Sequence, residues 1–301
     1  MIYELRCMAS GLPGHREISR YEYHQLRVAR RSLTEVLSVE ENYNGLLDRY
    51  ITMQRELVTA ILQVELHRPV DGVDFHGYSQ RLAREAACLL SVGRQYLDHT
   101  AHSVSEIARL NGKACLPFRE WCGKEYDERP GYRAIEAIRN AAQHRMLPSQ
   151  GIAIGGAWVD EGKRRQRRHS VSLRVYPKIL QENPKFKKKI AEELLGIAMK
   201  NHEDFVDLMD LIREHLTGLA TIHDKLRLAL ADEISSWEYL IEATLESWRK
   251  DFGRDLALAA NARDGRNVES VPIFGDYLMR RRRMTSQNDA GPRTFDFHIR
   301  C

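Results

Sequence analysis

The chain has 301 residues, of which 43 % are hydrophobic and 29 % charged, a composition typical of a globular chain and not of a disordered or fibrous one. Its formal net charge of +4 is too small to identify a polyanionic partner, and no apolar run approaches the roughly 20 residues that cross a bilayer. Five scattered cysteines and an N-terminus unlike a secretory leader predict a chain of the reduced cytoplasm, without a disulfide framework.

The N-terminal third of the chain predicts one short strand followed by two long helices. Residues 2–7 alternate as a half-buried strand does, and a glycine-rich segment then interrupts them. Apolar residues at helical spacing predict helices over 24–66 and 78–110, with Asn44-Gly45 as the weak point at which the first helix bends or divides. Because a short Pro/Gly link joins the two helices, we expect them to pack as an antiparallel pair.

A third helix is predicted over 133–146, between Pro130-Gly131 and Pro148. Apolar residues at spacings of three and four mark one buried face of this helix: Ile135, Ile138, Ala142 and Met146. At about 100° per residue, a polar stripe lies beside that face and consists of Arg139, Gln143, Asn140 and His144.

The stretch from Arg139 to His144 combines a fixed cation, an amide and an imidazole. These groups suffice to cleave RNA without a metal, because an imidazole that titrates near neutrality moves protons and a guanidinium stabilises a charged phosphorane. Asn140 lies four residues before His144 and can orient its ring, while the dipole at the end of the helix favours protonated His144.

The spacing of Arg139 and His144 does not discriminate by itself, because three other pairs share it: Arg94/His99, Arg164/His169 and Arg293/His298. Only the copy at 139–144 has Asn directly after Arg, two alanines that allow a second helix to approach, and a nearby Pro148. The hypothesis therefore depends on this context.

The context resembles the HEPN (higher eukaryotes and prokaryotes nucleotide-binding) family, whose motif is Arg, a polar residue that is often Asn, three further residues and His, on a helix of an all-α domain. The resemblance implies that Arg139 binds the phosphate, that His144 is the acid/base group and that Asn140 supports both. It also implies a homodimer with a composite active site, and cleavage by the ribose 2′-OH that leaves a cyclic phosphate and a 5′-OH without any cofactor.

Three alternatives remain open for the same residues. In the first, Arg139, Asn140 and His144 make only caps and surface hydrogen bonds. In the second, the chain is a catalytically inactive HEPN module that binds RNA or a protein partner. A family member can keep the fold without the catalytic activity. In the third, it is a HEPN subunit that works with a nucleotidyltransferase encoded elsewhere.

After the motif, the alternation over 151–177 predicts a β-hairpin. Basic residues crowd its tip: Lys163, Arg164, Arg165, Arg167 and Arg168. Together with Arg145, these cations are candidates for contact with an RNA backbone, and a solvated loop is the competing interpretation.

Helical spacing returns over 187–200, 202–227 and 232–260, so the helical core is expected over about 20–148 and 182–260. The remaining segment, 261–301, is expected to be irregular and basic, with a block of arginines from 280 to 283. Within it, 294–299 alternates like a last strand that could pair with the first.

Other constellations give weaker signals. The spacing of His99, His102, Cys115 and Cys122 does not match a common zinc site. The glycines of 151–156 lack the fingerprint of a phosphate-binding loop. Four tryptophans are expected to pack in the core or at an interface: Trp121, Trp158, Trp237 and Trp248.

The sequence thus predicts a single, mainly α, HEPN-like antiparallel helical bundle over 1–301 with a small β-hairpin insertion. The expected function is that of a metal-independent endoribonuclease with a toxin or phage-defence role. The expected partners are RNA, a second copy of the chain, and an antitoxin or nucleotidyltransferase, with no membrane association.

Overall fold

The computed structural model describes residues 1–8, 14–66, 72–143, 146–161, 164–253, 255 and 257–288, with backbone alone for 72–74, 159–161 and 164–168. The described chain forms two compact units. Unit 1 contains residues 1–44, 98–118 and 223–288, and unit 2 contains 45–97 and 119–222.

The mainly α class predicted from the sequence is confirmed. Helices occupy the segments with helical spacing: α1 (Arg20–Leu66), α2 (Gly72–Asn111), α4 (Pro130–Ala142), α6 (Lys188–Lys200), α7 (Leu208–Ala229) and α8 (Ala231–Phe252). Helix α1 does not break at Asn44-Gly45, although the boundary between the two units falls there. Tyr43 and Leu46 on either side are buried, so packing outweighs the low helix propensity of this dipeptide. Helices without a sequence prediction are α3 (Phe118–Glu128), α5 (Pro177–Glu182) and α9 (Asp276–Gln287).

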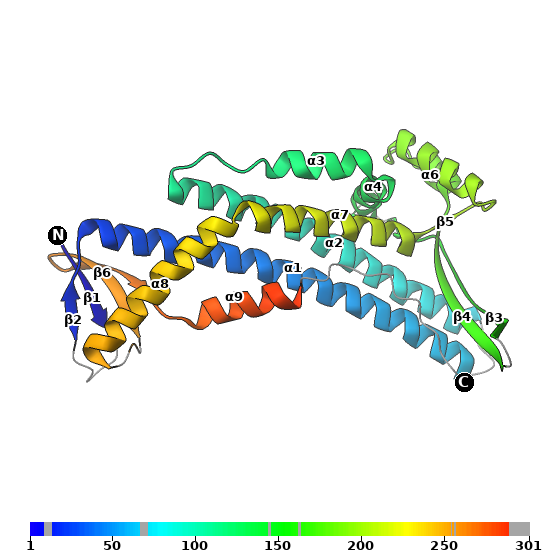
Figure 1. The fold of residues 1–301 in the computed structure, drawn as a ribbon. Helices are drawn as coiled ribbons and strands as arrows, with labels where there is room; N and C mark the ends of the chain where they lie inside the picture. The colour runs from blue at the N-terminus through cyan, green and yellow to red at the C-terminus, as the bar shows by residue number, and fades with distance from the viewer. Residues whose placement is uncertain are drawn as a thin grey trace. The chain divides into compact units, whose positions relative to one another are not determined.

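Unit 1 contains a four-stranded sheet that joins distant parts of the chain. Its order is β2-β1-β6-β7, from β1 (Ile2–Cys7), β2 (His15–Glu17), β6 (Leu258–Asp264) and β7 (Asn267–Pro272). Strands β1 and β6 pair antiparallel, with Leu5 opposite Ala260. The C-terminal part of α8 lies beside this sheet (Figure 1), where the Arg16 Nη1 of β2 donates to Asp251 Oδ2 of α8 at 2.9 Å.

The prediction of an irregular segment over 261–301 is wrong for its described part. The segment continues β6 and then forms β7 and α9. Strand β6 is rich in alanine and was predicted to extend a helix, but it lies between β1 and β7 and is buried over most of its length. Asp264-Gly265 is a hairpin signal that the sequence analysis missed, and Gly265 has the positive φ of 58° that such turns need. The predicted strand 294–299 lies outside the described residues, and both edges of β1 are occupied by β2 and β6.

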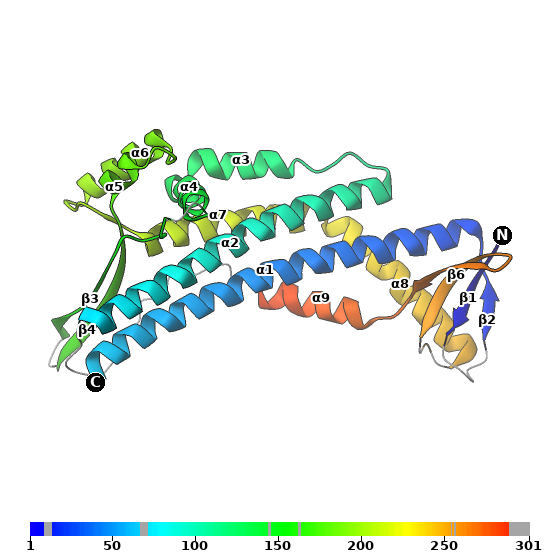
Figure 2. The same ribbon diagram turned by 180° about the vertical axis from the view of Figure 1, so that it is seen from behind.

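Unit 2 contains the predicted hairpin as β3 (Gly151–Glu161) and β4 (Arg164–Val175), with a short third strand, β5 (Val206–Asp207). Figure 2 shows the hairpin beside the C-terminal end of α1, where His169 Nδ1 lies 3.4 Å from Glu65 Oε1. The tryptophans were expected in the core or at an interface, and Trp158 on β3 is 59 % exposed, so it does not belong to the core of the chain.

Helices α4 and α7 of unit 2 cross closely, and glycine makes the approach possible on both sides. The Gly131 N–H of α4 donates to Glu214 Oε2 of α7 at 2.9 Å. A Cβ atom on Gly131 would lie 2.8 Å from Glu214 Cβ, and one on Gly218 of α7 would lie 2.6 Å from the Tyr132 ring of α4. No side chain larger than hydrogen fits at either position without movement of Glu214 or of buried Tyr132.

We expect Gly218→Ala to lower the free energy of unfolding by about 1–3 kcal/mol, because overpacking against buried Tyr132 outweighs the gain in helix propensity. The matched control is Gly196→Ala at an exposed position of α6, where a Cβ meets nothing within 4 Å. This control should raise stability by up to about 1 kcal/mol. Urea denaturation followed by circular dichroism measures both, and equal effects of the two substitutions would contradict the close crossing.

Candidate functional sites

Helix α4 carries the sequence motif and is anchored at its start by Arg133. This side chain donates from Nη1 to Tyr126 O at 3.0 Å and to Asp127 O at 2.8 Å, at the end of α3. Its Nε donates to Glu193 Oε2 of α6 at 2.7 Å. Ile135 and Ile138 are buried as predicted, so the helix has one apolar face and the motif lies beside it.

Arg139 is held in a half-buried position by groups from α4 and α2. Its Nη2 donates to Asn140 Oδ1 of the motif. The Glu136 carboxylate lies 3.8 Å from Arg139 Nη2 and 3.7 Å from Arg94 Nη1 of α2. The Arg139 side chain is only 14 % exposed, and its buried Nε has no hydrogen-bond partner among the described residues. Two guanidinium groups therefore share one carboxylate at this place.

His144 and Arg145 lie outside the described residues, so the predicted pairing of Asn140 with His144 has no structural test. Helix α4 ends at Ala142, earlier than the predicted Met146, and the Gln143 N–H donates to Arg139 O at 3.2 Å. The Met146 N–H returns to Ala141 O at 3.4 Å. The described chain on both sides of residues 144 and 145 is thus attached to the end of α4.

The basic residues of the hairpin are described only in part. Lys163 lies outside the described residues, whereas the backbones of Arg164, Arg165, Arg167 and Arg168 belong to β4. The base of the hairpin is connected to the segment that follows the motif. Gln150 N donates to Arg174 O at 2.9 Å, and the Tyr176 N–H donates to Gln150 Oε1 at 3.0 Å. The motif helix and the basic strand therefore belong to one unit, and Gln150 joins the base of the strand to the segment that follows the motif.

His215 of α7 is a buried residue near Arg139 that the sequence analysis missed. Its ring centroid lies 4.7 Å from that of Tyr132, and within the described chain neither ring nitrogen has a hydrogen-bond partner. Burial, together with the positive charge of Arg139, lowers the pKa of His215 to about 3. His215 is therefore neutral at ordinary pH. Nothing in the local sequence of α7 distinguishes it from other polar residues of the helix.

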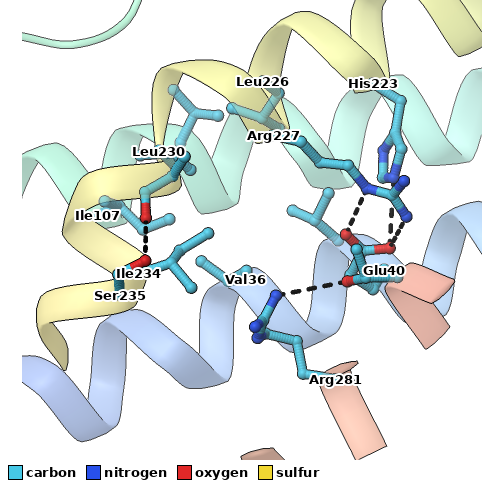
Figure 3. A pocket seen from close by; sticks show the side chains of 14 residues that line it. Val36, Glu40, Ile107, His223, Leu226, Arg227, Leu230, Ile234, Ser235 and Arg281 are labelled. Carbon is cyan, nitrogen blue, oxygen red and sulfur yellow. Dashed lines mark hydrogen bonds and ion pairs between the residues drawn. The ribbon is translucent and has the colours of Figure 1, made fainter. Parts of the chain in front are cut away.

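Unit 1 contains a pocket of about 240 Å³ between α1, α2, the α7–α8 junction and α9 (Figure 3). One part of its wall is apolar and includes Val36, Val104, Ile107, Leu226 and Ile234. Its polar lining includes Glu40, His223, Arg227 and Arg281. An apolar pocket with a few convergent polar groups is the usual form of a small-molecule site.

Glu40 is the most buried charge of this pocket. Arg227 donates to both of its oxygens, from Nε at 2.8 Å and from Nη2 at 2.6 Å, and His223 Nε2 lies 3.4 Å from Oε2. Burial would raise the pKa of Glu40, but the hydrogen bonds from His223 and Arg227 outweigh burial and lower it to about 2. Burial lowers the pKa of His223, so its ring is neutral and Glu40 and Arg227 form the ion pair.

Within the described ranges, no group of three or more His, Cys, Asp or Glu residues is arranged to hold a metal ion. No described helix is both long and apolar enough to cross a bilayer. Comparison of the chain with protein-family models, curated proteins and solved structures gave no match.

We expect Glu40→Gln to lower the free energy of unfolding by about 3 kcal/mol at neutral pH, because Arg227 loses its buried charge partner. The pKa of Glu40 is depressed, so its contribution is present above its ordinary value of 4.5 and is lost as the pH falls towards about 2. The difference between the wild type and this variant should therefore shrink over that interval.

Urea denaturation at several pH values measures this difference, with Glu41→Gln as the matched control. Glu41 pairs with Arg280, whose side chain is 62 % exposed, so the control should change stability by at most about 1 kcal/mol. A pH-independent difference for Glu40→Gln would disprove the depressed pKa.

Proposed function

We propose that the chain is a metal-independent endoribonuclease of HEPN type that acts as a homodimer. Arg139 binds the scissile phosphate, His144 moves the protons and Asn140 orients Arg139. The observation that carries the proposal is the hydrogen bond from Arg139 to Asn140, which couples two residues of the motif at the end of α4. A guanidinium positioned in advance loses less entropy when it binds a phosphate.

The chemistry requires proton transfer at two oxygens and stabilisation of one charged intermediate. The ribose 2′-oxygen loses its proton and attacks the adjacent phosphorus, while the 5′-oxygen gains a proton and leaves. The products are a cyclic 2′,3′-phosphate and a 5′-OH end. An imidazole at position 144 supplies both proton transfers across the dimer, and Arg139 stabilises the phosphorane.

The electrostatics around Arg139 support anion binding. Its distance of 3.8 Å to Glu136 exceeds the 2.7–2.9 Å that is typical of a charge-assisted hydrogen bond. Arg94 approaches the same carboxylate at 3.7 Å. One carboxylate thus faces two guanidinium groups, and neither pair is close enough to satisfy Arg139 fully.

The hairpin of unit 2 supports RNA as the polyanion. Its basic strand β4 lies in the unit that carries the motif. The base of the hairpin is attached at Gln150, which is seven residues after Gln143. Arg145 and Lys163 extend this basic set in the sequence. Cations on such an arm bind a phosphate backbone without regard to base sequence.

A second candidate function is a catalytically inactive HEPN module that binds RNA or a protein, including as the partner of a nucleotidyltransferase. The burial of Arg139 and its ion pair with Glu136 favour this alternative, because both reduce access of a substrate to the guanidinium. Such a module retains binding and lacks cleavage. A toxin or phage-defence role belongs to the catalytic proposal alone.

We expect the wild type to cleave single-stranded RNA in the presence of EDTA and to leave cyclic phosphate ends, as identified by mass spectrometry. Arg139→Ala and His144→Ala should each lower the rate at least about 100-fold, since each removes a group that acts in the transition state.

The matched control is His99→Ala, which removes an exposed histidine that follows Arg94 at the same spacing. It should cleave as the wild type does. Binding without cleavage by the wild type would favour the inactive module, and cleavage that survives both motif substitutions would refute the assigned roles.

We expect the combined substitution of Arg164, Arg165, Arg167 and Arg168 by Gln to weaken binding of single-stranded RNA. Each lost phosphate contact should reduce the slope of log K against log salt by about 0.7. Fluorescence anisotropy over a series of salt concentrations measures both quantities. The control changes four exposed lysines of the same unit to Gln: Lys178, Lys185, Lys188 and Lys189. Equal loss in the two variants would show that only overall charge matters.

A further inference from the structure

The pocket of unit 1 combines an apolar wall with a cation whose hydrogen bonds are incomplete. Arg281 extends from α9 towards Val36 and the apolar wall (Figure 3). Its Nε donates to Glu238 Oε1 at 2.7 Å, and Nη2 lies 2.7 Å from the same oxygen. Among the described residues, the contact of Nη1 is a long one of 3.4 Å with Thr285 Oγ1. One edge of this guanidinium is therefore available to a ligand.

The carboxylates near Arg281 leave one edge of its guanidinium unused. Glu238 pairs with Arg282 as well as Arg281, with Arg282 Nε at 2.9 Å from Oε2, and Arg282 Nη1 also lies 2.7 Å from Glu242 Oε1. Glu40, which lines the pocket, is engaged by Arg227 through both oxygens. Among the described contacts, neither Glu40 nor Glu238 accepts from Arg281 Nη1, so this edge keeps its donors for a negatively charged ligand.

Thr285 supplies a second polar group at the same end of the pocket. Its hydroxyl oxygen accepts from Arg281 Nη1, and for its hydroxyl hydrogen the described chain provides no acceptor. Arg281 Nη1 and Thr285 together offer two donors, which suits an oxygen acceptor that carries charge.

We propose that this pocket binds a small organic monocarboxylate with an apolar aromatic or aliphatic body. The carboxylate accepts from Arg281 Nη1 and Thr285 Oγ1, and the body lies against Val36, Val104 and Ile107. The volume of about 240 Å³ limits the size of the body. A cavity of about 150 Å³ accommodates benzene, so this pocket fits a phenyl ring with a short chain or a medium-length acyl chain. The inference is independent of the proposed nuclease function.

Isothermal titration calorimetry of the full chain with phenylpropionate, octanoate and naphthoate tests the proposal. We expect at least one acid to bind, and its neutral amide to bind about tenfold more weakly because it lacks the charge. Arg281→Met should weaken binding of the acid by a similar factor. This variant is expected to fold, since Glu238 keeps Arg282 as its partner.

The matched control is Arg280→Met, which changes the neighbouring arginine of α9 that pairs with Glu41 and does not line the pocket. It should bind as the wild type does. Val104→Phe, which fills the pocket, should abolish binding while circular dichroism confirms the fold. The proposal is overturned if none of the three acids binds at millimolar concentration. It is equally overturned if acid and amide bind alike, or if Arg281→Met and Arg280→Met have the same effect.

Discussion

The close crossing of α4 and α7 is the contact on which the arrangement of unit 2 depends. Gly131 and Gly218 bring the two helices together, and the hydrogen bond from the Gly131 N–H to Glu214 ties the first turn of α4 to α7. Because Tyr132 is buried against Gly218, the rotation of α4 about its axis is set. This rotation buries Ile138, leaves Asn140 exposed and places Arg139 between the two environments. The guanidinium of Arg139 is therefore held by packing and by its bond to Asn140, with only 14 % of the side chain exposed.

The two candidate sites use charge in different ways. In unit 2, Glu136 lies 3.8 Å from Arg139 and 3.7 Å from Arg94, so both ion pairs are loose. In unit 1, Arg227 donates hydrogen bonds to both oxygens of Glu40 at 2.8 and 2.6 Å, so each charge has its partner within the pair. The loose arrangement suits a site that exchanges one anion for another. The tight pair occupies both oxygens of Glu40, and in our proposal Arg281 and Thr285 provide the donors for a ligand of that pocket.

Most of the helices and the β3–β4 hairpin could be predicted because their patterns are local. The helical spacing of α1, α2, α6, α7 and α8 reports a buried face within a few residues. The prediction failed at β6, where an alanine-rich stretch became a strand between β1 and β7. Alanine carries a helical preference of its own, and only the pairing with a strand from the other end of the chain outweighs it. The arrangement of Arg139 and Asn140 is also local, since the hydrogen bond between them joins sequence neighbours.

The sequence by itself determined the mainly α class, the positions of most helices, the hairpin and the motif from Arg139 to His144. These features depend on residues only two to four positions apart, so a short stretch of sequence is enough to predict them. Only the tertiary structure decided that β6 pairs with β1, that Glu40 meets Arg227 and that neutral His215 lies near Arg139. These partners are separated by long stretches of chain, and no local periodicity encodes which distant element packs against which. Burial then set their charge states, because desolvation acts on a side chain only after its neighbours have enclosed it.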